Sequence, residues 1–149
     1  RVYSDEQKST ELICIKARSI IDFGAGYDIT DSQTGEAICS FKREGLKSIF
    51  KDSWKVMDSS GNQIGTISED NGLLALVRRF VPFADIFVPQ EFILSAGENP
   101  VTFTQSGGFW GTIVNKLYVK NIHSSGLDPR LVLAATMLLI AIEGKQGAG

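Results

Sequence analysis

An apolar segment near the C-terminus constrains the fold more than any other feature of the chain. Residues 131–142 read LVLAATMLLIAI, with a single hydroxyl and no charge. At about 1.5 Å of rise per residue, this helix would reach roughly 18 Å, short of the roughly 30 Å apolar core of a bilayer. A helix that is apolar on every side must be surrounded by other protein. We therefore predict a central helix over residues 128–143, enclosed by a curved sheet.

The residues on either side of this segment carry the signals of helix ends. Asp128 is an N-cap acceptor, and Pro129 after it suits the first helical position. Gly144 stands where a left-handed C-terminal cap would fall. These residues predict where the helix begins and ends.

A pattern that occurs twice predicts β-hairpins. Residues 27–38 and 54–64 both read aromatic-x-aliphatic-x-Asp-Ser-turn-Gly-x-x-Ile, and residues 92–103 are a weaker third echo. The Asp-Ser pair opens a turn by bonding its own backbone, and Gly35 or Gly61 takes the positive-φ position. Hairpins at this spacing favour an antiparallel meander of short strands. The alternative is that such turns are common and the echo is accidental.

The rest of the chain fits one domain over residues 1–149. Residues 12–17 and 110–119 have strand patterns, and residues 73–80 suit a short amphipathic helix that Pro82 must end. The polar residues 1–10 are expected to be frayed. No linker longer than a loop divides the chain.

Composition and charge exclude several classes of protein. Hydrophobic residues make up 43% of the chain and charged residues 21%, which is typical of a globular protein. A net charge of −2 gives no global attraction to nucleic acid or to an anionic membrane, so such binding needs a local patch. Cys14 and Cys39 belong to no CxxC pair, and we expect them to be reduced and buried in a cytoplasmic protein.

No catalytic or metal-binding pattern stands out in the sequence. The only histidine, His123, lies in a polar loop and is interpreted as a solvated residue. A zinc site needs about four nitrogen or sulfur ligands, which this histidine and two scattered cysteines cannot supply. The acidic pairs fit solvated turns. We therefore predict no catalytic residue, no metal, no cofactor and no enzymatic activity.

Two basic clusters remain as candidate binding sites. The first has aromatic neighbours and could form a patch for lipid phosphates; it contains Lys42, Arg43, Lys47 and Lys51. The alternative is that these residues protect strand edges against aggregation. The second could anchor in a membrane interface, and it joins Arg78 and Arg79 to Phe80, Phe83 and Phe87. Its alternative is that the aromatic rings pack under the sheet and the arginines extend to solvent.

Two stretches resemble the tubby C-terminal-domain-like superfamily, which includes tubby domains, phospholipid scramblases and LURP-one-related proteins. Residues 54–67, WKVMDSSGNQIGTI, are similar to a hairpin common in scramblase and LURP-one-related sequences. Gly111-Thr-Ile113, followed by Leu127-Asp-Pro-Arg-Leu131 and the apolar segment, is similar to the C-terminal end of scramblases. The resemblance implies a mainly β fold, a closed antiparallel barrel of about twelve strands around the C-terminal helix.

The functional features of these relatives transfer only in part. Scramblases carry an acidic calcium segment before the last helix, but residues 121–127 contain no carboxylate here, so we expect no calcium site. The phosphoinositide pocket of tubby domains has no residue-by-residue match. We expect a non-enzymatic cytoplasmic domain, peripheral at a membrane without spanning it, that binds anionic phospholipid headgroups and not nucleic acid. The alternative is a structural or protein-interaction module without a lipid ligand, with Phe80, Phe83 and Phe87 as its contact surface.

Overall fold

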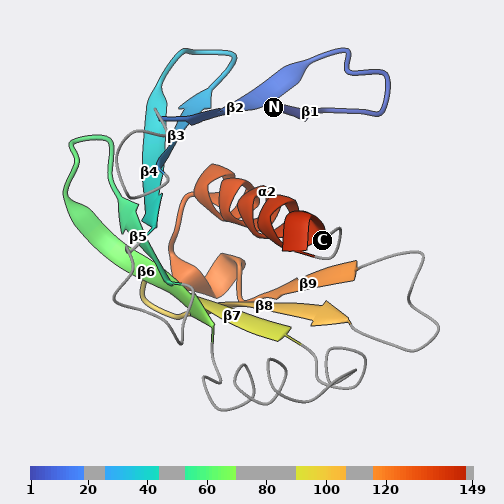
Figure 1. Cartoon of the computed structure of the whole chain (residues 1–149). Helices are drawn as coiled ribbons and strands as arrows, with labels where there is room; N and C mark the ends of the chain where they lie inside the picture. Colours follow the sequence, from blue (N-terminus) through green and yellow to red (C-terminus); the bar gives the residue numbers. More distant parts are fainter. Residues whose placement is uncertain (19–25, 44–52, 70–89, 107–115, 147–149) are drawn as a thin grey trace.

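In the part of the chain that the structure describes, a nine-stranded antiparallel sheet curves around one C-terminal helix (Figure 1). This computed structural model describes residues 1–18, 26–43, 53–69, 90–106 and 116–146. A 3-10 turn, η2 (His123–Ser125), precedes the helix α2 (Pro129–Gln146). The strands are β1 (Val2–Tyr3), β2 (Glu11–Ala17), β3 (Gly26–Asp31), β4 (Ala37–Arg43), β5 (Ser53–Met57), β6 (Gln63–Glu69), β7 (Gln90–Ser95), β8 (Val101–Ser106) and β9 (Lys116–Lys120).

Each strand pairs with the next one in the chain, so the sheet is a meander from β1 to β9. The two repeated motifs form the hairpins β3–β4 and β5–β6, and the weaker echo forms β7–β8. The repeat therefore predicted the hairpins and the antiparallel meander correctly.

The turns of the two repeated hairpins have the predicted chemistry. The Asp31 carboxylate accepts hydrogen bonds from the backbone N–H groups of Gln33 and Thr34, at 2.8 and 3.0 Å. The Asp58 carboxylate accepts equivalent bonds from two N–H groups in its own turn. Gly35 and Gly61 have φ angles of 75° and 85°, which a side chain would make costly. The aspartates and glycines thus close the turns that fix the strand register.

The alternation of side chains gives the sheet a buried inner face and a polar outer face. Residues opposite one another share a face, and the inner rows contain pairs such as Phe41–Val56, Ile67–Leu94 and Phe92–Phe103. These side chains pack against apolar residues of α2 in one core: Leu131, Val132, Ala134, Ala135, Leu138 and Leu139. The helix contacts β2, β4 and β9, so it lies in the hollow of the sheet.

The helix begins as predicted but ends later. An Asp128 carboxylate oxygen accepts a hydrogen bond from the Arg130 backbone N–H at 2.8 Å, which caps the first turn. At the other end, Gly144 does not terminate α2, which continues to Gln146.

The prediction of a closed barrel of about twelve strands is wrong. The described strands form one open sheet in which β1 and β9 are the two edges. Figure 1 shows α2 lying between these edges, which do not meet. The helix is consequently not enclosed on every side, because Leu133 and Ile140 are 38% and 50% exposed. The closed barrel was implied by the resemblance to tubby-like domains, together with the assumption that an apolar helix must be completely surrounded.

Three further predictions concern short segments. Residues 1–10 contain β1, which pairs with β2, so this segment is not simply frayed. The strand expected over residues 110–119 is observed from Lys116, and its earlier residues lie outside the described ranges. The short helix predicted over residues 73–80 also lies outside the described residues.

The segment before α2 is tied to the β7–β8 turn by close backbone contact. The Glu98 N–H donates to the Ser125 carbonyl oxygen at 2.9 Å, and the Asn99 side chain donates to the Ser124 carbonyl oxygen at 2.8 Å. Ser125 is completely buried. A Cβ added at Gly97 would overlap the Ser125 carbonyl oxygen, so only glycine allows this approach.

We expect Gly97→Ala to destabilise the protein by about 1–3 kcal/mol, the usual cost of overpacking. The measurement is urea unfolding followed by circular dichroism. Gly61→Asn is the control, because its added Cβ meets nothing within 4 Å and asparagine tolerates positive φ. An equal loss in both variants would contradict the packing argument.

The two cysteines are free thiols in different environments, partly buried for Cys14 and buried for Cys39. Burial, with a smaller contribution from the negative charge of Asp128, raises the pKa of the Cys39 thiol to about 12. In a Cys14→Ser variant, we expect Cys39 to react with Ellman's reagent readily in urea but very slowly in the folded protein. The shift from 9.0 lowers its thiolate fraction roughly 1,000-fold at neutral pH. Rapid reaction of the folded variant would contradict the observed burial.

Candidate functional site

The two ends of the sheet differ in the charged residues that they carry. The hairpin turns and the start of α2 lie at one end, which we call the turn end. It is rich in carboxylates: Glu11, Asp31, Glu36, Asp58, Glu98 and Asp128. The opposite end, where β2 and β4 finish and β3 and β5 begin, carries basic residues. We call it the basic end.

Four basic residues share the outer face of β2–β5 at the basic end, and we call them the basic face: Lys16, Arg18, Lys42 and Lys55. The register sets their common direction. Lys16 is opposite Asp28, Asp28 is opposite Ser40, and Lys42 follows Ser40 by two residues. Because side chains alternate along a strand, all of these residues point away from α2.

Lys42 and Lys55 are directly opposite each other on neighbouring strands. Like charges in this position destabilise a sheet, by a few tenths of a kcal/mol to about 1 kcal/mol. Arg18 forms an ion pair with Asp28, whose carboxylate accepts two bonds from the Arg18 Nε at 2.9 Å. This hydrogen-bonded guanidinium lowers the pKa of Asp28. Among the described outer positions at this end, Asp28 on β3 and Glu91 on β7 are acidic, so the four residues of the basic face outnumber these carboxylates.

The neighbouring residues Lys42 and Arg43 do not act as one cluster. Lys42 points outward, whereas Arg43 is opposite Trp54 and shares the inner face with it. The Arg43 guanidinium carbon lies 6.0 Å from the centre of the Trp54 ring, within range of a cation–π contact. Tyr27 packs against the same indole, with ring centres 5.8 Å apart. Arg43 thus covers the rim of the core, and Lys42 belongs to the basic face.

The other predicted site residues are not placed. Lys47, Lys51, Arg78, Arg79, Phe80, Phe83 and Phe87 lie outside the described residues. The basic face instead adds Lys16, Arg18 and Lys55, which the sequence interpretation missed. The hairpin motif fixes which residues of β5 face outward. Combined with the alternation of side chains along the strand of Lys42, it would have placed Lys55 near Lys42.

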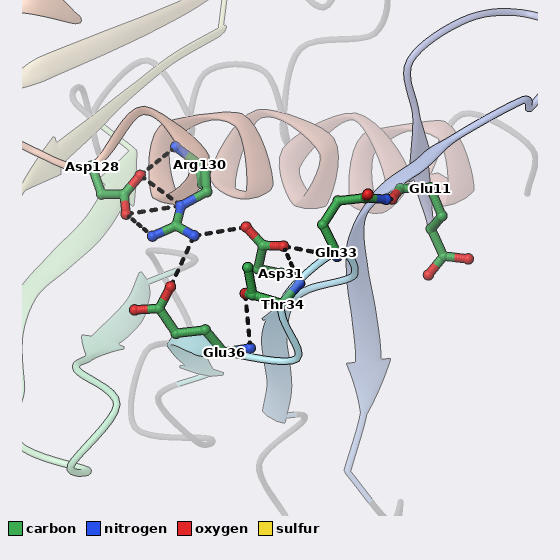
Figure 2. Close-up of polar contacts among 7 residues, drawn as sticks. All are labelled: Glu11, Asp31, Gln33, Thr34, Glu36, Asp128 and Arg130. Atoms are coloured by element: carbon green, nitrogen blue, oxygen red, sulfur yellow. Dashed lines mark hydrogen bonds and ion pairs between the residues drawn. The ribbon is translucent and has the colours of Figure 1, made fainter.

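A second charged cluster, at the turn end, centres on Arg130 in the first turn of α2 (Figure 2). Its guanidinium donates to Asp128 Oδ2 at 2.8 Å, to Asp31 Oδ2 at 2.7 Å and to Glu36 Oε2 at 3.1 Å. Asp31 and Glu36 belong to the β3–β4 hairpin, so Arg130 joins the helix start to that turn. The described partners of Arg130 are all protein carboxylates, which is the pattern of a structural anchor.

The β3–β4 turn is also held from the β2 side. The Glu11 carboxylate accepts a hydrogen bond from Ser32 Oγ at 2.8 Å, and the Glu11 carbonyl oxygen accepts one from the Gln33 side chain at 2.8 Å. The β3–β4 turn therefore lies between β2 and α2. Figure 2 shows Gln33 directed towards β2 and Asp31 directed towards Arg130 of the helix.

The chemistry available in the described ranges is limited. These residues contain no group of three histidine, cysteine or carboxylate side chains arranged to hold a metal ion. Within the same ranges, no helix has the length and apolar character needed to cross a membrane. The basic face offers ammonium and guanidinium groups on an open surface, which suits recognition of anions.

Comparisons with protein-family models, with curated proteins and with solved structures give no match to this chain. The resemblance to the tubby-like superfamily therefore stays a prediction from the sequence.

The Arg130 anchor predicts a specific dependence of stability on pH. Arg130 and the turn N–H groups lower the pKa of Asp31 from 3.8 to about 2. Since the folded pKa is the lower one, this stabilisation is present above about pH 4 and is lost as the pH falls towards 2. We expect Arg130→Met to lower the urea midpoint at pH 7, with the difference from wild type shrinking between pH 4 and 2.

Arg1→Met is the matched control for this measurement. Arg1 also pairs with a carboxylate, Glu11, but its side chain is 65% exposed and it connects only β1 to β2. We expect a smaller change in the urea midpoint for this variant. A loss in Arg130→Met that is constant from pH 7 to pH 2 would show that the carboxylates do not carry the effect.

Proposed function

We propose that this protein is a non-enzymatic binding domain that attaches to anionic phospholipid headgroups through its basic face. The observation that carries the proposal is the convergence of Lys16, Arg18, Lys42 and Lys55 on one outer surface. Lys42 and Lys55 lie opposite each other on neighbouring strands, and a surface rich in phosphates would place negative charge beside both.

The shape of the basic face fits an extended surface better than a small enclosed ligand. Its residues lie on the outer side of β2, β4 and β5, with β3 between them. Neighbouring strands are about 4.8 Å apart, so the face spans roughly 14 Å across the sheet. Lys16, Arg18 and Lys42 are exposed. Side chains on such an open surface can meet several headgroups at once.

The charge separation of the sheet would orient the protein at a membrane. Glu11 and Asp58, at the turn end, lie five residues from Lys16 and three residues from Lys55, roughly 10–17 Å along the strands, and a negative surface repels them. Each lysine or arginine close to an anionic leaflet contributes about 1 kcal/mol of binding. A protein with a net charge of −2 can therefore bind an anionic surface when its basic end faces that surface.

The test is co-sedimentation with vesicles of phosphatidylcholine, with and without phosphatidylserine. We expect binding to the anionic vesicles only, weakening as salt rises and the Debye length falls below about 10 Å. The double variant Lys42→Gln, Lys55→Gln should weaken binding about 30-fold, from about 1 kcal/mol for each lysine removed.

The control is the double variant Lys8→Gln, Lys120→Gln, which removes the same charge at the turn end. We expect its affinity for anionic vesicles to stay close to that of wild type. Equal losses in the two double variants would mean that net charge alone governs binding. Absence of binding at low salt would reject the proposed function.

A further inference from the structure

One edge of the sheet is open beside an uncovered strip of the helix. β9 pairs with β8 and, among the described strands, with no other. An antiparallel edge strand presents backbone N–H and C=O groups that can pair with an added strand. β9 has five residues, whereas β1 at the opposite edge has two, so β9 is the longer template.

The helix surface beside this opening is apolar. Leu133 and Ile140, seven residues apart and hence on one side of α2, are 38% and 50% exposed, and the partly buried Met137 lies between them. The sheet covers the opposite side of the helix. The strip therefore faces the gap between β1 and β9, the side on which Figure 1 shows no described strand over α2.

β9 itself defines the chemistry that a neighbouring strand would meet. Leu117 and Val119 point inward and pack against the core. Lys116, Tyr118 and Lys120 point outward, and Tyr118 is 52% exposed. A strand added beside β9 would thus have lysines next to its outward side chains and the apolar helix strip next to its inward ones.

We infer that the β9 edge binds an extended segment of a partner protein in which acidic residues alternate with aliphatic residues. Backbone pairing with β9 would supply the shared hydrogen bonds, which is the general mode of strand addition. The acidic side chains would lie beside Lys116 and Lys120, and the aliphatic ones would cover Leu133 and Ile140.

Charge argues against a second copy of the same chain at this edge. In an antiparallel β9–β9 pair centred on Tyr118, Lys116 of each copy would lie opposite Lys120 of the other. Directly opposed like charges destabilise a sheet. Acidic residues in the partner remove this repulsion and replace it with attraction.

The test uses a capped synthetic peptide of alternating valine and glutamate, added to the ¹⁵N-labelled protein. We expect saturable binding, with the largest amide shifts in β9 and in α2 around Leu133 and Ile140. Lys116→Gln with Lys120→Gln should weaken binding about tenfold, which corresponds to about 1.4 kcal/mol. Ile140→Ser should also weaken binding without lowering the thermal midpoint, because this side chain is half exposed.

Two modified peptides separate strand addition from simple charge attraction. Methylating the backbone nitrogens along one peptide edge keeps every charge but removes the donors to β9, so we expect binding to disappear. Exchanging glutamate for lysine should also abolish it. Undiminished binding of either peptide would overturn the inference, as would a dimer in light scattering that excludes the peptide.

The lipid-binding proposal is tested independently of this one. Lys42→Gln with Lys55→Gln should leave peptide affinity unchanged, and Lys120→Gln, at the turn end, should weaken peptide binding but keep binding to anionic vesicles. A variant that lost both activities together would contradict the assignment of two separate surfaces.

Discussion

Burial of one side of α2 in the curved sheet is the interaction on which the structure depends. The strands contribute Phe41, Val56, Leu94 and Phe103, and the helix contributes Ala134, Ala135 and Leu139, each nearly inaccessible to solvent. A sheet of short strands needs such a partner for its apolar face. Small alanines at the centre of the contact allow the helix to approach the strands closely.

The start of the helix is positioned by polar contacts at the turn end. Asp128 caps α2, Arg130 ties its first turn to the β3–β4 hairpin, and the Ser125 carbonyl accepts a bond from the β7–β8 turn. Two hairpins that are far apart in the sequence therefore determine where the helix enters the hollow. Apolar burial supplies the driving force, and these directional bonds select the geometry.

The local elements could be predicted from the sequence because their signals are local. An aspartate that bonds its own turn and a glycine with positive φ identify a hairpin without knowledge of the rest of the chain. Sheet closure is different, because it depends on whether β1 and β9 meet, and no short motif encodes that distance. The exposure of Leu133 and Ile140 was missed because an apolar sequence pattern shows which side chains favour burial. It does not show how much of the helix surface the sheet can cover.

Strand pairing groups the basic residues differently from their order in the sequence. Sequence proximity grouped Lys42 with Arg43, yet consecutive residues in a strand point to opposite faces. Lys16 and Lys55 are distant from one another in the sequence and share a face with Lys42 only through the register of four strands. A charged surface on a sheet is thus set by pairing across strands, which has to be known before the surface can be assembled.

The order of elements along the chain has a consequence for biosynthesis. Each described strand after β1 pairs with the described strand before it, so the sheet can grow by local steps as the polypeptide leaves the ribosome. The helix that fills its hollow is made after all nine described strands. Until the helix is made, Phe41, Phe92 and Phe103 are not covered by it, and the nascent chain exposes an apolar concave surface. A chaperone would be most needed during that interval. A chain terminated before Pro129 would keep this apolar surface exposed.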